Sequence, residues 1–242
     1  MLTPNRKAFV KICCITSQQE ADLAIAAGAD ALGLVSQMPS GPGVIADPVI
    51  AQIARTVALA VANHTLTRPI QTFLLTAQQT VHAIALQHQR CQTTHIQLVD
   101  AVPVAELVAL RQRLPGVPLV QVIHVQGAAA LAEALAVAPW VDLLLLDSGN
   151  PHLAVKELGG TGRTHNWAIS AQIVDNSPVP VLLAGGLNAQ NAALALRTVS
   201  PYGLDLCSGV RDAPSAGFGL NVAKLTAFVA ATREPCIPPA PC

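Results

Sequence analysis

The sequence predicts an α/β fold, a (β/α)8 TIM barrel in which eight parallel strands alternate with helices. Eight short apolar runs rich in Val, Ile and Leu are spread over the 242 residues, and most of them lack polar–apolar alternation. Such runs are typical of parallel strands covered on both faces. Helical patterns separate the runs, and the length suits eight strand–helix units around one aliphatic core. We therefore expect a single barrel domain over residues 1–232.

In order along the chain, the expected strands are residues 9–15, 31–36, 70–76, 94–100, 119–125, 141–148, 179–186 and 204–209. A doubly wound open sheet is the alternative, but it usually carries a glycine-rich dinucleotide loop after the first strand. This chain has no GxGxxG pattern at that point.

Capping residues indicate where several helices begin and end. Ser17 is expected to cap a helix over residues 18–27, which Gly28 ends, and Asp47 before Pro48 is expected to cap a second helix that runs to about Val61. The other expected helices are residues 77–89, 103–114, 127–136, 165–176 and 188–199. The proline-rich tail, residues 233–242, is expected to be disordered.

Composition excludes several classes of protein. Apolar residues make up 52% of the chain and charged residues 12%, and the formal net charge is zero. We therefore expect no binding to nucleic acid or to an anionic membrane surface. No run approaches the ~18–20 apolar residues that span a bilayer, and the first residues do not resemble a signal peptide. Six cysteines without CxxC spacing favour a cytoplasmic chain with free thiols and no metal site.

The carboxyl ends of barrel strands carry the candidate chemistry. These positions hold Cys13, Ser36, Thr76, Asp100, His124, Asp147, Gly185 and Asp205. A carboxyl group held against apolar residues suits a general acid, as at Asp147, and a thiol among hydrogen-bond donors suits a base, as at Cys13. Two simpler interpretations stay open. Cys13 can pack as a small hydrophobic residue, with Cys14 on the opposite face of the strand, and Asp147 can cap the following helix.

Three glycine-bearing loops follow strands in the last third of the chain. The first is Leu158-Gly159-Gly160-Thr161-Gly162-Arg163-Thr164, and the others contain Gly185-Gly186 and Ser208-Gly209. Bare backbone N–H groups at such tips favour anions, so together the loops predict a phosphate cradle. The predicted substrate- and phosphate-binding residues are Gly160, Thr161, Gly162, Gly185, Gly186, Asp205, Ser208 and Gly209.

An ordered set of motifs extends from Lys11 to about Phe228. The motifs are Lys11-Ile12-Cys13-Cys14-Ile15-Thr16, Gly28-Ala29-Asp30-Ala31-Leu32-Gly33, Ile96-Gln97-Leu98, Leu144-Leu145-Leu146-Asp147-Ser148, Gly159-Gly160-Thr161-Gly162-Arg163-Thr164 with Trp167, Leu183-Ala184-Gly185-Gly186-Leu187-Asn188, and Asp205-Leu206-Cys207-Ser208-Gly209-Val210. In this set the chain resembles the phosphoribosylanthranilate isomerases.

The resemblance implies a (β/α)8 barrel that acts in tryptophan biosynthesis. It implies an Amadori rearrangement of an N-ribosyl amine to an aminodeoxyribulose, with Cys13 as the general base and Asp147 as the general acid. It also places the phosphate among the three glycine loops. The reaction requires no metal or organic cofactor, because the iminium intermediate is itself the electron sink.

The chain departs from the family pattern on the side of the aglycone. The family usually has Ser-Pro-Arg after the second strand, and its Arg contacts the anthranilate carboxylate, whereas Gly43 stands at that position here. Candidates for aglycone contacts are therefore Gly43 through its backbone, His124 and Arg163. Other departures are Cys14 for Gly, Val99-Asp100 for His-Gly, His165-Asn166 for Phe-Asp, and Arg211 for Glu.

Three functions stay open at this point. The first is an isomerase acting on phosphoribosylanthranilate, the second is a paralogous isomerase or lyase acting on another phosphorylated sugar, and the third is a non-catalytic phosphosugar-binding protein. The presence of both Cys13 and Asp147 argues against the third, and the missing Arg favours the second over the first. The first still ranks ahead, because the resemblance runs in order along nearly the whole chain. In each case we expect a phosphorylated small-molecule partner and a monomer or homodimer.

Overall fold

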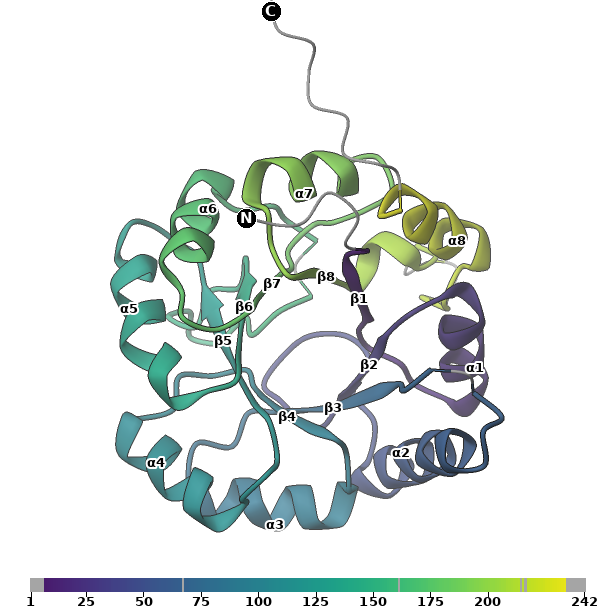
Figure 1. Cartoon of the computed structure of the whole chain (residues 1–242), viewed down its shortest axis with the longest axis horizontal. Coiled ribbons are helices and arrows are strands. Elements are labelled where there is room, and N and C mark those ends of the chain that lie inside the picture. Colours follow the sequence, from purple (N-terminus) through teal and green to yellow (C-terminus); the bar gives the residue numbers. More distant parts are fainter. Residues whose placement is uncertain (1–6, 67, 161, 214, 216, 234–242) are drawn as a thin grey trace, which may run out of the picture.

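Eight parallel strands form a closed barrel, and helices surround it on the outside (Figure 1). A computed structural model describes residues 7–66, 68–160, 162–213, 215 and 217–233. Thr161 and most of the predicted tail lie outside the described residues. Each strand pairs in parallel with the next one along the chain, and the first pairs with the eighth. The predicted (β/α)8 barrel is therefore confirmed.

The strands are shorter than the apolar runs that predict them. They are β1 (Phe9–Ile12), β2 (Ala31–Val35), β3 (Gln71–Thr76), β4 (His95–Leu98), β5 (Leu119–His124), β6 (Leu143–Asp147), β7 (Val181–Leu183) and β8 (Gly203–Leu206). The remaining residues of each run form the loops at the two ends of the barrel.

Eight α-helices alternate with these strands among the described residues. They are α1 (Gln18–Ala27), α2 (Asp47–Ala62), α3 (Val81–Cys91), α4 (Val104–Arg113), α5 (Ala129–Val137), α6 (Trp167–Asn176), α7 (Ala192–Val199) and α8 (Val222–Ala231). Two short 3₁₀ helices, η1 (Ala138–Trp140) and η2 (Ser208–Val210), were not predicted, and neither was α8.

Several helix starts differ from the predicted ones. Ser17 caps α1 as expected, and Gly28 ends it in a left-handed conformation. Asp47, by contrast, is the first residue of α2 rather than its cap, because its carboxylate bonds to side chains of neighbouring elements. Asn166, not His165, precedes α6 and accepts a hydrogen bond from Ala168 N. Residues 188–191 form a turn closed by Asn188, which delays the start of α7.

Two apolar clusters make up the core. The larger one packs the outward faces of the strands against the helices and includes Val10, Ile12, Leu34, Leu146 and Phe228. The smaller one fills the barrel with alternate strand residues, such as Phe73 with Leu75 and Val120 with Val122. This alternation follows from the two-residue period of a strand, which sends every second side chain into the barrel.

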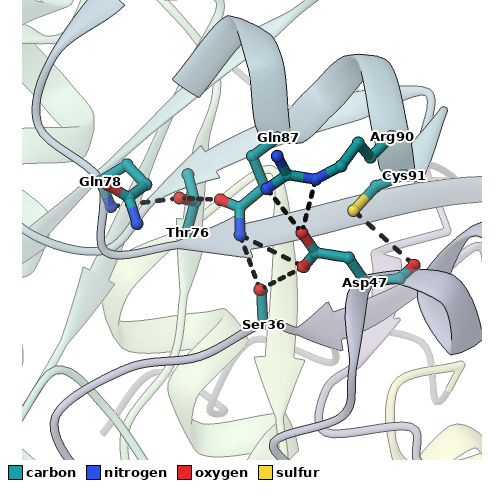
Figure 2. A network of polar contacts seen from close by, with 7 residues as sticks. All are labelled: Ser36, Asp47, Thr76, Gln78, Gln87, Arg90 and Cys91. Atoms are coloured by element: carbon teal, nitrogen blue, oxygen red, sulfur yellow. Dashed lines mark hydrogen bonds and ion pairs between the residues drawn. The ribbon is translucent and has the colours of Figure 1, made fainter. Parts of the chain in front are cut away.

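A buried polar network ties the ends of β2 and β3 to helices α2 and α3 (Figure 2). Gln87 of α3 lies at its centre: its amide nitrogen donates to Ser36 Oγ at 2.7 Å, and its amide oxygen accepts from Thr76 Oγ1 at 2.5 Å. Ser36 also donates to the Asp47 carboxylate at 2.7 Å, which in turn accepts from Arg90. Ser36 and Thr76, two predicted strand-end candidates, therefore brace the barrel against its helices.

Candidate active site

A cavity at the carboxyl end of the barrel brings the predicted acid, base and glycine loops together. Its lining includes Cys13 after β1, Asp147 at the end of β6 and Asp205 in β8. The glycines of the three loops that line it are Gly159, Gly160, Gly162, Gly185 and Gly186. Strands from opposite parts of the chain thus deliver their side chains to one site, as the barrel topology requires.

Cys13 and Cys14 both line the cavity, so the prediction that they face opposite sides of a strand is wrong. The strand ends at Ile12, and Cys14 adopts a left-handed backbone conformation with φ of 62°. This conformation favours glycine, so another contact has to hold it. The Arg211 guanidinium donates to the carbonyl oxygen of Cys14 and to the Glu20 carboxylate at 2.8 Å. Arg211 therefore fixes the turn that follows β1.

The environment of Cys13 favours its thiolate. The side chain is only 7% exposed, and Cys13 N donates to Leu206 O of β8 at 2.8 Å, which fixes the residue at the barrel mouth. A hydrogen bond from the Cys14 thiol lowers the pKa of Cys13; burial opposes this, and the nearby Lys11 ammonium lowers the pKa further. The net direction is downward, which suits a proton acceptor.

The pKa of Asp147 shifts in the opposite direction, upward. Burial raises the pKa of this carboxyl, and the Ser148 backbone N–H, which donates to it at 2.7 Å, only partly offsets the effect. The other carboxylate oxygen faces Gly159, where a side chain would come within 2.8 Å of it. Asp147 is not a helix cap, because α6 begins at Trp167 and is capped by Asn166. A buried carboxyl group with a raised pKa can donate a proton near neutral pH.

The glycine loops present backbone to the cavity. Gly160, Gly162, Gly185 and Gly186 all have positive φ, between 61° and 83°. A Cβ at Gly186 would come within 2.7 Å of the Arg163 backbone, so the loops after β6 and β7 pack directly on each other. Ser208, after β8, completes this side of the lining.

Gly209 has a packing role instead of lining the cavity. A Cβ there would approach Leu187 O to 1.9 Å, so only glycine allows the loops after β7 and β8 to meet. Asp205 lines the cavity, but its carboxylate is bonded to the Lys11 ammonium at 2.8 Å.

The three candidates for aglycone contacts do not line the cavity. A Cβ on Gly43 would lie 2.5 Å from Cys14 Cβ, and the loop instead presents Gly41 and Pro42. The His124 ring bonds to Val99 O at 3.0 Å. Arg163 pairs with Glu157 at 2.5 Å, and its side chain is 59% exposed. Among the described lining residues there is accordingly no Lys, Arg or His.

Sequence reasoning missed several lining residues, of which Gln97 carries the clearest signal. Its side chain is 3% exposed, and its amide oxygen has no hydrogen-bond partner among the described residues. A polar residue in the middle of an apolar strand is the pattern that could have identified it. Other lining residues that were not predicted include Cys14, Met38, Pro42, Leu158 and Cys207.

Two loops meet across the mouth of the cavity. Ser40 Oγ donates to Lys156 O at 2.6 Å, and a Cβ on Gly160 would come within 2.6 Å of Pro42 Cδ. Lys156 also pairs with Asp100 at the end of β4, so that predicted strand-end carboxylate anchors a loop. The β2–α2 and β6–α6 loops therefore close over the acid and the base.

The described residues contain no group of three or more His, Cys, Asp or Glu side chains placed to hold a metal ion. Within the same part of the chain, every helix is too short or too polar to cross a bilayer.

Comparison with known proteins gives consistent results. The model of the N-(5'phosphoribosyl)anthranilate (PRA) isomerase family matches residues 10–214. The N-(5'-phosphoribosyl)anthranilate isomerase of Halobacterium salinarum is 32% identical over 232 residues, covering 94% of this chain and 98% of that protein. The Nostoc punctiforme enzyme is 36% identical over 206 residues, covering 85% and 90%. The crystal structure of phosphoribosyl anthranilate isomerase from Thermus thermophilus superposes with a TM-score of 0.72 at 26% identity, covering 92% of this chain and 97% of that one.

Proposed function

The chain belongs to the N-(5'-phosphoribosyl)anthranilate isomerase family, and we propose that Cys13 and Asp147 carry out that family's proton transfers in this protein. The reaction is an intramolecular oxidation–reduction in tryptophan biosynthesis: C2′ of the sugar is oxidised to a ketone while C1′ is reduced. The observation that carries the proposal is that both side chains line one cavity, from β1 and β6, together with the glycine loops.

The two residues would act in sequence. Protonated Asp147 gives its proton to the ring oxygen of the ribose, the C1′–O bond breaks, and the amine nitrogen forms a Schiff base with C1′. The Cys13 thiolate then takes the proton from C2′, and the electron pair moves into the iminium to give an enolamine. Tautomerisation of the enolamine gives the aminodeoxyribulose product. The raised pKa of Asp147 and the lowered pKa of Cys13 favour the protonation states that these steps require.

Genetic complementation tests the function as a whole. Expression of the natural chain in a bacterium that lacks this isomerase should restore growth without tryptophan. A chain carrying both Cys13→Ala and Asp147→Asn should not restore growth, although it should accumulate to the same level. Failure of the natural chain to complement would instead favour a different phosphorylated sugar as substrate.

The backbone of the glycine loops would bind the substrate phosphate. Because the glycines have positive φ and touch neighbouring backbone, substituting them would disturb the loops themselves. Ser208 lines the same region without that constraint, so Ser208→Asp should place a carboxylate beside the phosphate. We expect Ser208→Asp to raise the KM for substrate at least about tenfold through charge repulsion.

The matched control is Ser208→Asn, which has a similar shape without the charge and should change KM much less. Inhibition by inorganic phosphate should weaken in parallel with substrate binding in the Asp variant. Equal KM values for the Asp and Asn variants would place the phosphate elsewhere.

Recognition of the anthranilate carboxylate should be weak. A hydrogen bond to a charged group typically contributes about 1.5–3 kcal/mol, and no Lys, Arg or His lines the cavity among the described residues. We therefore expect two product analogues, one with and one without the ring carboxylate, to have inhibition constants within about tenfold of each other.

A preference above about a hundredfold for the carboxylated analogue would show that a cation reaches the ring. Arg163→Ala would then test an exposed guanidinium of the β6–α6 loop, which pairs with Glu157 in this structure. Gly43→Arg is a poor alternative test, because its side chain would collide with Cys14.

The proposed isomerase activity implies that the main partner is a small phosphorylated substrate. Neutral net charge supports the absence of a nucleic-acid or membrane partner. We also infer that the protein is cytoplasmic and that it is a monomer or a homodimer. Size-exclusion chromatography with light scattering would test the oligomeric state.

A further inference from the structure

A fully buried lysine lies inside the barrel directly below Cys13. The Lys11 side chain is 0% exposed, and its ammonium bonds to the Asp205 carboxylate at 2.8 Å. The ammonium also lies 5.3 Å from the centre of the Phe73 ring. Lys11 lies in β1, and Cys13 directly follows the strand two residues later, so the two side chains point to the same side.

Gly33 provides the space in which the ammonium and the sulfur approach each other. The register pairs Lys11 with Ala31 and Ile12 with Leu32, so Gly33 continues it beside Cys13. A Cβ on Gly33 would lie 2.9 Å from Cys13 Sγ and 3.0 Å from Lys11 Nζ. Gly33 is not among the glycines with positive φ, so its backbone does not require glycine. The absent side chain instead lets the two groups converge on one gap.

A buried ion pair at this position needs a reason. Taking two charges out of water is unfavourable, and apolar side chains of similar size often serve equally well in a core. Apolar residues such as Phe73 and Val120 fill much of the barrel interior. The ion pair therefore suggests that the ammonium acts on a neighbour.

Five titratable groups either line the cavity together with Cys13 or act on it electrostatically. Lys11 and Cys14 are on its own segment, Asp205 and Cys207 are on and just after β8, and Asp147 ends β6. The Asp205 carboxylate, which is bonded to Lys11, raises the pKa of Cys13, but less than the Lys11 ammonium lowers it. The residues that β2 presents on this side, Ala31, Gly33 and Val35, carry no titratable group.

We propose that Lys11 is a positioning residue for the reaction: its ammonium, held by Asp205, faces Cys13 through the gap at Gly33 and stabilises the sulfur as the anion that accepts the substrate proton. The inference rests on the proposed role of Cys13. Although burial lowers the pKa of Lys11, the Asp205 carboxylate and the two thiols raise it above its usual value, so the ammonium stays charged.

The test measures the titration of Cys13 separately from turnover. The rate of alkylation of Cys13 by iodoacetamide is followed against pH, and tandem mass spectrometry distinguishes Cys13 from Cys14. The midpoint of this curve is the pH at which half of the Cys13 thiol is ionised. In Lys11→Met this midpoint should rise by about one pH unit or more, which is equivalent to a tenfold loss of thiolate at a pH below the midpoint. In Gly33→Ala, which keeps every charge, the added methyl group separates the ammonium from the sulfur, and the midpoint should rise by less.

Gly127→Ala is the matched control, because its Cβ would meet nothing within 4 Å, and it should leave the midpoint unchanged. Unchanged midpoints in both folded test variants would overturn the proposal; if Lys11→Met fails to fold, Gly33→Ala decides alone. The pH profile of kcat/KM separates the two proposals. If the alkylation midpoint shifts but the rising limb of that profile does not shift with it, Lys11 acts on Cys13 as proposed while Cys13 is not the base. Failure of the Lys11 proposal is therefore distinguishable from failure of the proposed role of Cys13.

Discussion

Replacement of Asp147 by asparagine should lower kcat on phosphoribosylanthranilate by at least about 10²-fold, because the amide cannot donate the proton that opens the ribose ring. The side chain keeps its shape and can still accept the hydrogen bond from Ser148 N, so the loop that it supports should stay in place. The KM should change little, since the lost interaction belongs to the transition state.

Asp100→Asn is a suitable control for this prediction. Asp100 also lies at the carboxyl end of a strand, but its carboxylate pairs with Lys156 outside the lining of the cavity. The Asp100→Asn substitution should lower kcat far less than Asp147→Asn does. Near-normal turnover of the Asp147 variant would reduce that residue to a structural carboxylate.

Replacement of Cys13 by serine should have an effect of similar size. The hydroxyl nearly matches the thiol in volume, but its pKa is far too high to yield an anion at neutral pH, so C2′ would lose its base. We expect kcat to fall by at least about 10²-fold, with a smaller change in KM.

Cys14→Ser offers the matched comparison. Cys14 lines the same cavity one residue later, and a serine there can still donate a hydrogen bond to Cys13. Steady-state kinetics of the two variants should therefore differ by an order of magnitude or more. Equal losses would indicate that the turn after β1, and not the Cys13 thiol, matters.

The sequence predicted the barrel well because its signals are local. Runs of Val, Ile and Leu mark buried parallel strands, and Ser17 and Gly28 bound α1 through short-range hydrogen bonds. Cys13, Asp147 and the glycine loops could be predicted to lie together because the carboxyl ends of barrel strands share one face.

Features set by distant contacts could not be predicted in this way. Cys14 turns into the cavity because Arg211, far along the chain, holds its carbonyl oxygen. Asp47 bonds to Ser36 and Arg90 instead of capping its helix, which no short-range rule indicates. The partner of His124, the carbonyl oxygen of Val99 after β4, likewise emerges only once the barrel is closed, and neither His124 nor Arg163 lines the cavity.

The pH dependence of kcat/KM on phosphoribosylanthranilate tests the acid–base pair most directly. Cys13 must be deprotonated, so the rate should rise with pH through its pKa, which lies below that of an ordinary thiol. Asp147 must be protonated, so the rate should fall as pH rises through its pKa, which lies above that of an ordinary carboxyl. The natural protein should therefore give a bell-shaped profile; Asp147→Asn should lose only the falling limb, and Cys13→Ser only the rising limb. Variants that keep both limbs would contradict the assignment of Cys13 and Asp147 as base and acid.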